Sequence, residues 1–386
     1  MHCIKINKVI AQMICLFYLM GFWHRSDKPT ARELRFKLFY CIYYSLFILS
    51  FMVGAIRSEK MDSTIFLTEV SVTALVYGAK LGILIWKQKQ IIDLLNRVCQ
   101  FSIRDDYGYV LFKDKLKGFI TFLICFEIAV AVGAVLSVLV LPFFGSEKTL
   151  FFEIAFPLDW RNNDVAFCVV TVFIFIGIMV TIFVLLFTIL IWYLLLNCSL
   201  RYEILGQELK NMGQIAADDI SKISEKQLHN NFFQSLKESI NTHVHLRGLT
   251  NDLGSFYSEI FLTQLGTSGL CICGSIYCLA FSIGDNLLEH FVHLLVFLYF
   301  IADIFMITYF GNEIMLSSNR LSYNLFESNW YNQPQSTKMC IIIFGEHLKQ
   351  PQAIVIGKLY PLTLETFTKI LNSAYSMFNI LKNIKR

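Results

Sequence analysis

The sequence has little charge and lacks the motifs of the common catalytic sites. Only 16% of its 386 residues are Asp, Glu, Lys or Arg, whereas 55% are hydrophobic. A soluble domain of this length could not bury so much apolar surface. The chain also lacks a phosphate-binding loop, a nucleophile elbow and a CxxC pair. We therefore expect a membrane protein that is not an enzyme and uses no cofactor.

The cysteines and histidines show no pattern of a cross-linked or metal-binding protein. The 11 cysteines follow no framework spacing, and several fall in segments expected in the reducing cytosol. His243 and His245 would point to different sides of a helix, and His290 with His293 would need further ligands. The basic residues are spread over several loops rather than gathered in a patch. We expect no disulfide scaffold, no metal site and no nucleic-acid partner.

Seven apolar segments are long enough to cross a bilayer as helices. The fourth is longer than a bilayer requires, so we expect it to continue into the cytosol. Segment 9–23 is too short to span and is expected at the membrane interface. A signal peptide is the alternative for this segment, but no small-x-small cleavage site follows its apolar run. The predicted spans are 36–56, 64–86, 119–141, 165–196, 256–280, 288–310 and 361–381.

The basic residues predict how the chain is oriented. Four segments that would lie on one side, 1–35, 87–118, 197–255 and 311–360, hold 23 of the 33 Lys and Arg, and the opposite side holds 7. Because Lys and Arg are enriched on the cytoplasmic side, the amino terminus is predicted to be cytosolic and the carboxyl terminus extracellular. This orientation argues against a G-protein-coupled receptor.

The chain is predicted to be a single seven-span membrane domain over 1–386, all-α, with its polar connections 197–255 and 311–360 in the cytosol. The first connection has two helix-compatible patterns separated by small and acidic residues, which is typical of a helical hairpin. We expect these two segments to form a cytosolic anchor region between subunits.

Three ionisable residues lie within the predicted spans at about the same depth. Lys80, Glu127 and Asp303 are each 6 to 8 residues from the cytoplasmic end of their span. Charged groups are costly in hydrocarbon, so they are expected to face protein or water and to pair. We predict a buried charge cluster in which Lys80 pairs with Glu127 or Asp303. It would serve as a static clip or as part of a gate.

The last predicted span has one broad polar face and one apolar face, as expected for a helix beside water or among other helices. It is therefore the best pore candidate in the chain. Its polar face carries Thr366, Lys369, Asn372, Ser373, Ser376 and Asn379, and its apolar face carries Phe367, Ile370, Leu371, Ala374, Phe378 and Leu381.

The carboxyl-terminal third contains a series of short stretches that recur together over about 60 residues. They are Trp330-Tyr331, 338–343, Lys349-Gln350-Pro351, Gly357-Lys358, 361–367, Ile370-Leu371 and 374–378. This part of the chain resembles the insect odorant receptor family, and chain length, seven spans and a cytosolic amino terminus agree with the resemblance.

The resemblance implies an odorant-specific subunit of a ligand-gated, non-selective cation channel in the plasma membrane of a sensory neuron dendrite. It implies four subunits around one pore, usually including an obligate co-receptor, with the last helix lining the pore. The family's Tyr-centred motif matches Tyr375, which places pore and gate positions at Ala374, Phe378, Leu381 and Lys382. The co-receptor pattern has a small aliphatic residue and a Gln where this chain has Phe378 and Leu381, so this chain is not the co-receptor. Rings of Phe378 and Lys382 would constrict a homomeric pore and repel cations, which favours heteromers.

An odorant pocket is expected in the outer half of the helix bundle, because a small apolar volatile gains affinity mainly from burial. Phenylalanines of the outer loop 142–164 would cap such a pocket or form an interfacial belt. The predicted lining residues, which could equally be core, are Thr73, Val76, Tyr77, Val130, Gly133, Ser137, Phe175, Met179, Phe183, Tyr277 and Tyr299.

Three alternatives remain at this point. A gustatory-type receptor channel would share the architecture, but its usual terminal Gln-Phe pattern is absent after Tyr375. A secondary transporter would show internal repeats and broken helices, and neither is visible. A membrane enzyme would need a nucleophile and a base at one depth, which only the predicted charge cluster approaches.

Overall fold

A computed structural model describes residues 2–26, 28–58, 61–140, 150–152, 154–160, 162–214, 224–281, 287–350, 352–357 and 359–385. Described segments are almost entirely helical, which confirms the all-α prediction. The helices are α1 Lys8–Leu19, α2 Ala31–Arg57, α3 Met61–Trp86, α4 Gln88–Cys99, α5 Asp106–Val135, α6 Asp164–Lys210, α7 Glu225–Ala280, α8 Leu287–Phe326, α9 Gln335–Leu348 and α10 Leu364–Lys385, with the π-helical turn η1 Leu136–Val140 and the 3-10 turn η3 Trp330–Asn332. Strand β1 His2–Ile4 pairs with β2 Phe101–Ile103, and β3 Val355–Ile356 with β4 Tyr360–Pro361.

The seven predicted spans correspond to helices, with two differences at their ends. The last span, 361–381, was begun too early, because Pro361 belongs to β4 and α10 starts at Leu364, and residue 141 at the end of the third span lies outside the described residues. Six of these helices, α2, α3, α5, α6, α7 and α8, are long and apolar enough to cross a membrane, among the described residues. The seventh, α10, has 22 residues, which is sufficient length, but half of its residues are polar. Its polar face explains why composition alone does not mark it as a span.

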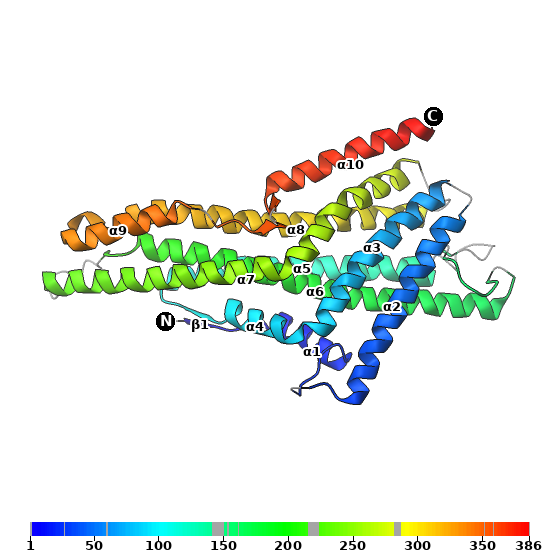
Figure 1. Ribbon diagram of the computed structural model, residues 1–386, viewed down its shortest axis with the longest axis horizontal. Coiled ribbons are helices and arrows are strands. Elements are labelled where there is room, and N and C mark those ends of the chain that lie inside the picture. The colour runs from blue at the N-terminus through cyan, green and yellow to red at the C-terminus, as the bar shows by residue number, and fades with distance from the viewer. Residues whose placement is uncertain are drawn as a thin grey trace.

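Three of the helices are much longer than a bilayer requires. α6 has 47 residues, α7 has 56 and α8 has 40, whereas about 20 suffice to cross. Their extensions lie alongside α9 at one end of the molecule (Figure 1). The predicted anchor region is thus built from continuous helices, and part of the hairpin tip, 215–223, lies outside the described residues.

α6 is the central helix of the fold. Every side chain from Phe187 to Leu200 is buried, because α7 and α8 pack against it along this stretch. Gly206 permits close contact with α8, since a Cβ there would collide with Asn324. A helix that is apolar all round is expected at such a position.

The amino-terminal segment predicted at the interface forms α1, which is too short to cross. Ile10 and Phe17 of α1 are fully buried against the bundle. Trp23 follows, and its indole Nε1 donates to the carbonyl of Leu84 at 2.8 Å. α2 then begins at a capping box in which Thr30 and Glu33 bond reciprocally. The segment is therefore tied to the protein and not only to the membrane surface.

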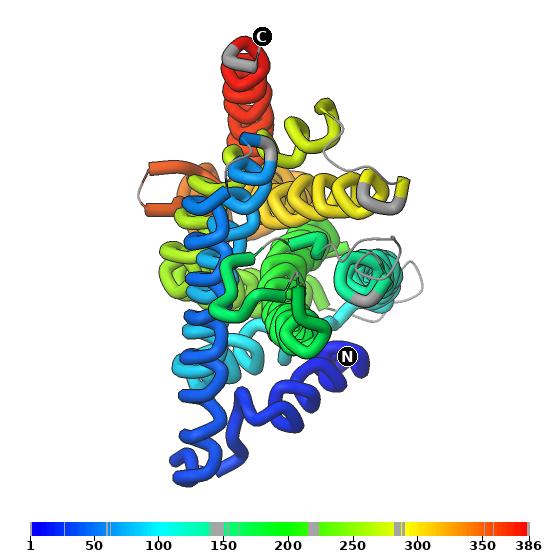
Figure 2. Tube along the Cα trace, turned by 90° about the vertical axis from the view of Figure 1, so that its right-hand side faces the viewer, coloured from blue at the N-terminus to red at the C-terminus, as the bar shows by residue number. Residues whose placement is uncertain are grey.

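α10 lies at the edge of the molecule and protrudes from the bundle in the end-on view (Figure 2). It packs through one face on α7 and α8. Gly311 of α8 allows this approach, because a Cβ there would lie 2.5 Å from the Leu362 carbonyl oxygen. One long side of α10 is thus left uncovered in a single chain.

Candidate ligand cavity and its polar floor

A cavity of about 550 Å³ lies between α2, α3, α5, α6 and α8. This volume suits a small organic molecule. Aliphatic and aromatic side chains make up most of its wall, so an apolar ligand would gain affinity by leaving water. The residues that line it include Tyr44, Phe47, Phe51, Glu69, Thr73, Tyr77, Phe126, Val130, Gly133, Ser137, Phe152, Ile178, Thr181, Leu185, Tyr299, Phe300 and Phe305.

Several residues predicted for the pocket lie in this wall. On α3 they share one face and on α5 they continue into η1, as the i, i+3 and i+4 spacing indicated. The residues in the wall are Thr73, Tyr77, Val130, Gly133, Ser137 and Tyr299.

The remaining predicted residues lie elsewhere. Phe175 and Met179 are 38% and 37% exposed on the outer surface of α6, and Phe183 packs on Phe22. Val76 borders a smaller void below the cavity. Tyr277 belongs to α7 and contacts Phe281, with ring centroids 4.6 Å apart. The face assigned to α6 must be corrected, because its wall residues are Ile178, Thr181 and Leu185.

One part of the wall was missed. α2 contributes Tyr44, Phe47 and Phe51, whose i, i+3, i+7 spacing was a detectable signal of one helical face. Phe152, from the segment between α5 and α6, lines the cavity, which agrees with the first of the two roles expected for the phenylalanines of loop 142–164, and Phe151 and Phe66 pack beside it. The neighbouring Phe143 and Phe144 lie outside the described residues.

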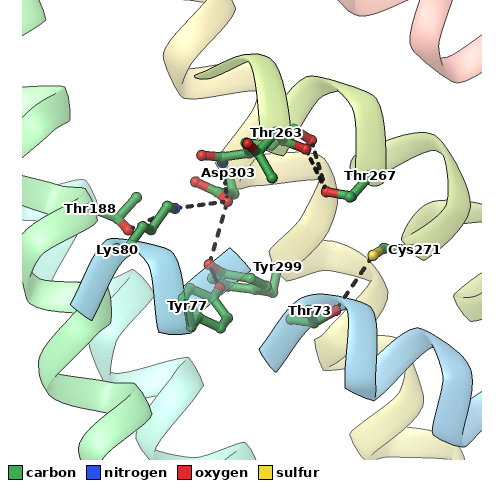
Figure 3. Close-up of polar contacts among 10 residues, drawn as sticks. Thr73, Tyr77, Lys80, Thr188, Thr263, Thr267, Cys271, Tyr299 and Asp303 are labelled. Atoms are coloured by element: carbon green, nitrogen blue, oxygen red, sulfur yellow. Dashed lines mark hydrogen bonds and ion pairs between the residues drawn. The ribbon is translucent and has the colours of Figure 1, made fainter. Parts of the chain in front are cut away.

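A buried polar network forms the floor of the cavity (Figure 3). The Lys80 ammonium lies 4.0 Å from Asp303 and donates to the Thr188 hydroxyl at 3.0 Å. Tyr299 donates to Asp303 at 3.5 Å and is hydrogen-bonded to Tyr77. The structure thus brings together Lys80 and Asp303, one of the two pairings that depth predicted.

Glu127 does not join this pair. Its Oε1 is buried without a hydrogen-bond partner among the described residues. Glu69, a further ionisable residue within the predicted span 64–86, accepts a hydrogen bond from Ser275 of α7 at 2.5 Å. The prediction that residues at the same depth cluster is therefore correct for Lys80 and Asp303 and wrong for Glu127.

The predicted pore residues of α10 do not share one environment. Ala374 is fully buried against Cys271, Cys273 and Phe300, so it faces the chain's own interior and not a pore. Phe378 and Leu381 are half-buried against the same cluster, whereas Lys382 is exposed. The exposed residues of α10 include Lys369, Asn372, Ser373 and Ser376 of its polar face together with Tyr375 and Ile380, whereas Thr366 of the polar face is buried.

These features define a class of protein: a multi-pass α-helical membrane protein with an apolar cavity, sized for a small ligand, between its spans. A family model described as 7tm Odorant receptor matches residues 60–375. The chain therefore belongs to the insect odorant receptor family, and the resemblance seen in its carboxyl-terminal third is confirmed. This assignment agrees with the expectation of a receptor rather than an enzyme.

Individual relatives agree with the family. The chain is 31% identical over 194 residues to Odorant receptor 94a of Drosophila melanogaster, an alignment that covers 50% of the chain and 47% of that receptor. The chain thus spans about half the length of this relative. It is 24% identical over 369 residues to Odorant receptor 59a of the same species, covering 90% and 88% of the two chains. The solved structure of olfactory receptor OR5 from Machilis hrabei in complex with eugenol has the same fold, with a TM-score of 0.82, 15% identity and 98% coverage of both chains.

Proposed function

We propose that this chain is an odorant-binding subunit of a ligand-gated, non-selective cation channel that assembles with an odorant co-receptor into a heteromeric tetramer. The family and the multi-pass fold support a place in the plasma membrane of a sensory neuron dendrite. The basic residues support a cytosolic amino terminus and an extracellular carboxyl terminus.

The observation that carries the proposal is the apolar cavity between the spans. In this proposal, the odorant is held by the wall residues of α3, α5 and α8, including Tyr77, Val130, Gly133 and Tyr299. Burial of an apolar odorant contributes about 25 cal/mol for each Å² removed from water. The presence of eugenol in the structurally similar olfactory receptor OR5 supports a small volatile as the ligand.

The pore wall is proposed to be the uncovered polar face of α10. Asn372, Ser373, Tyr375 and Ser376 are exposed there, while Ala374 is sealed inside the chain. Hydroxyl and amide groups can replace part of the water around a passing cation. Lys382 is exposed about two turns beyond Tyr375, and a co-receptor would dilute its charge at the pore mouth.

Currents recorded with and without an odorant co-receptor test the proposal. We expect odorant-gated cation currents only when both chains are expressed. Gly133→Leu should abolish them, because a Cβ at Gly133 already lies 3.3 Å from Leu295 in the cavity wall. Gly118→Leu on the same helix is the matched control, since nothing lies within 4 Å of a Cβ there. The absence of current with every odorant, despite confirmed surface expression, would contradict the channel assignment.

A further inference from the structure

Six hydroxyl-bearing side chains line the cavity: Tyr44, Thr73, Tyr77, Ser137, Thr181 and Tyr299. Each hydroxyl has one hydrogen to donate and two lone pairs to accept. If a hydroxyl already donates its hydrogen to another protein group, a ligand in the cavity can contact only its lone pairs. The hydrogen-bond network assigns all six.

The Lys80–Asp303 ion pair determines where the hydroxyl hydrogens of Tyr299 and Tyr77 point. Asp303 lies beside the Lys80 ammonium, so it is a carboxylate and only accepts. Tyr299, at 3.5 Å, must therefore donate its hydrogen to Asp303. The hydrogen between the two tyrosines then comes from Tyr77. Both phenol hydrogens are used, and the Tyr77 oxygen keeps its lone pairs.

A second pair lies on the opposite wall. Thr181 donates to the carbonyl of Gly177, one turn back on α6, at 3.0 Å. Tyr44 and Thr181 are 3.0 Å apart, and because the threonine hydrogen is already used, Tyr44 is the donor. Neither hydroxyl has a hydrogen left for a ligand.

The two remaining hydroxyls bond to their own helices. Thr73 donates to the carbonyl of Glu69 at 2.8 Å, and Ser137 donates to the carbonyl of Ala134 at 3.1 Å. The Glu69 carboxyl is turned towards α7, because its Oε2 lies 2.6 Å from a Cβ position on Gly274 and is buried. It therefore offers no hydrogen to the cavity either.

We propose that this cavity selects odorants that carry a hydroxyl group, namely small alcohols and phenols, over ketones, aldehydes and ethers of the same carbon skeleton. The wall's side-chain hydroxyls present lone pairs and no uncommitted hydrogen, so a ligand hydroxyl finds an acceptor and a ligand carbonyl finds no donor. A carbonyl oxygen would lose its bond to water without replacement. A charged amine fits less well, since its desolvation would need a carboxylate free to pair with it. The inference rests on the proposed ligand cavity and specifies its chemistry.

Two single-oxygen deletions test the hydrogen assignment with nearly equal change in shape. Tyr299→Phe removes the acceptor of the Tyr77 hydrogen and thus frees a donor towards the cavity. The preference for alcohols should then fall to none or reverse. Tyr77→Phe leaves the Tyr299 hydrogen on Asp303 and exposes the Tyr299 lone pairs. In this variant the preference for alcohols should persist.

Affinities of cyclohexanol against cyclohexanone, benzyl alcohol against benzaldehyde, and p-cresol against its methyl ether would be measured by ligand-induced stabilisation of the purified chain. We expect wild type to bind the hydroxyl member about threefold to tenfold more tightly. Equal affinities within the pairs, no binding of any hydroxyl compound, or equal effects of Tyr299→Phe and Tyr77→Phe would overturn the inference.

Gly133→Leu and Gly118→Leu separate this test from that of the function itself. If Gly133→Leu alone abolishes all binding while alcohols and ketones bind wild type equally, the ligand binds in the cavity but the proposed preference for alcohols is wrong. If Gly133→Leu leaves binding unchanged, the ligand does not occupy this cavity, and both proposals fail.

Discussion

Replacing Lys80 by Met should destabilise the protein strongly, although Lys80 is not among the residues that line the ligand cavity. Its side chain is 1% exposed, and its ammonium lies 4.0 Å from the Asp303 carboxylate. At that separation two charges attract by about 4 kcal/mol when the effective dielectric constant is about 20. Breaking a buried pair typically costs about 3 to 5 kcal/mol, since the remaining charge is left without compensation. Proton uptake by Asp303 would limit the loss towards the lower value.

The assay is unfolding of the purified protein in mixed micelles, followed by tryptophan fluorescence. We expect Lys80→Met to lower the midpoint well below wild type, and Lys80→Met combined with Asp303→Asn to recover much of the loss because both charges are gone. Lys369→Met is the matched control. Its ion pair with Glu365 is shorter, at 2.7 Å, but both side chains are about 70% exposed, so no measurable loss is expected. A double variant as unstable as the sum of its two single changes would refute the coupling.

Three further predictions concern other parts of the chain. Burial, followed by the neighbouring Lys37 ammonium, lowers the pKa of His24 below 6.5, so its protonation favours the unfolded state. Stability should therefore decline as the pH falls below about 6.5, and His24→Gln should reduce this slope in melting curves recorded between about pH 7.5 and about pH 5.5. Ser373→Cys should react with a charged thiol reagent and reduce the current, whereas the adjacent Ala374→Cys should stay unmodified; the reverse order would contradict the proposed pore face. Gly206→Val should destabilise the region where α6 packs on α8 by about 1 to 3 kcal/mol, the usual cost of overpacking a tight contact, and unchanged protease resistance of that region would count against the α6–α8 contact.

The position of a residue along its span could be predicted from the sequence. Which side of a helix faces the protein interior could be predicted only where the helix has one polar and one apolar side. The regular rise of a helix placed Lys80 and Asp303 at one level, and the structure pairs them. α10 has a polar stripe, and four residues of this stripe are exposed in the fold, Lys369, Asn372, Ser373 and Ser376, whereas Thr366 is buried. α6 is apolar all round, so nothing in its sequence distinguished Phe175 and Met179, which face outwards, from Ile178 and Thr181, which face the cavity.

Contacts between helices that are distant in sequence also could not be predicted from the sequence. Glu127 matches Lys80 in depth but lies on α5, which packs more loosely against the bundle than the other spans. The spacing of Tyr44, Phe47 and Phe51 marks one face of α2, but whether that face meets the cavity depends on how α2 crosses α3 and α6, which no local pattern encodes. These errors affect which residues line the site, and they leave the fold and the family unchanged.

One stretch of α8 joins the three features that the proposed function needs. Tyr299 and Phe300 both line the cavity, and Tyr299 donates to Asp303 one turn further along. Phe300 also packs in the buried cluster that holds Ala374 of α10. A ligand shifts a conformational equilibrium only by as much as it contacts the two states differently. Because the ligand wall, the charge pair and the support of α10 share these few residues, we expect a change in cavity contacts at α8 to shift the proposed pore helix directly, through Phe300 and the buried cluster around Ala374.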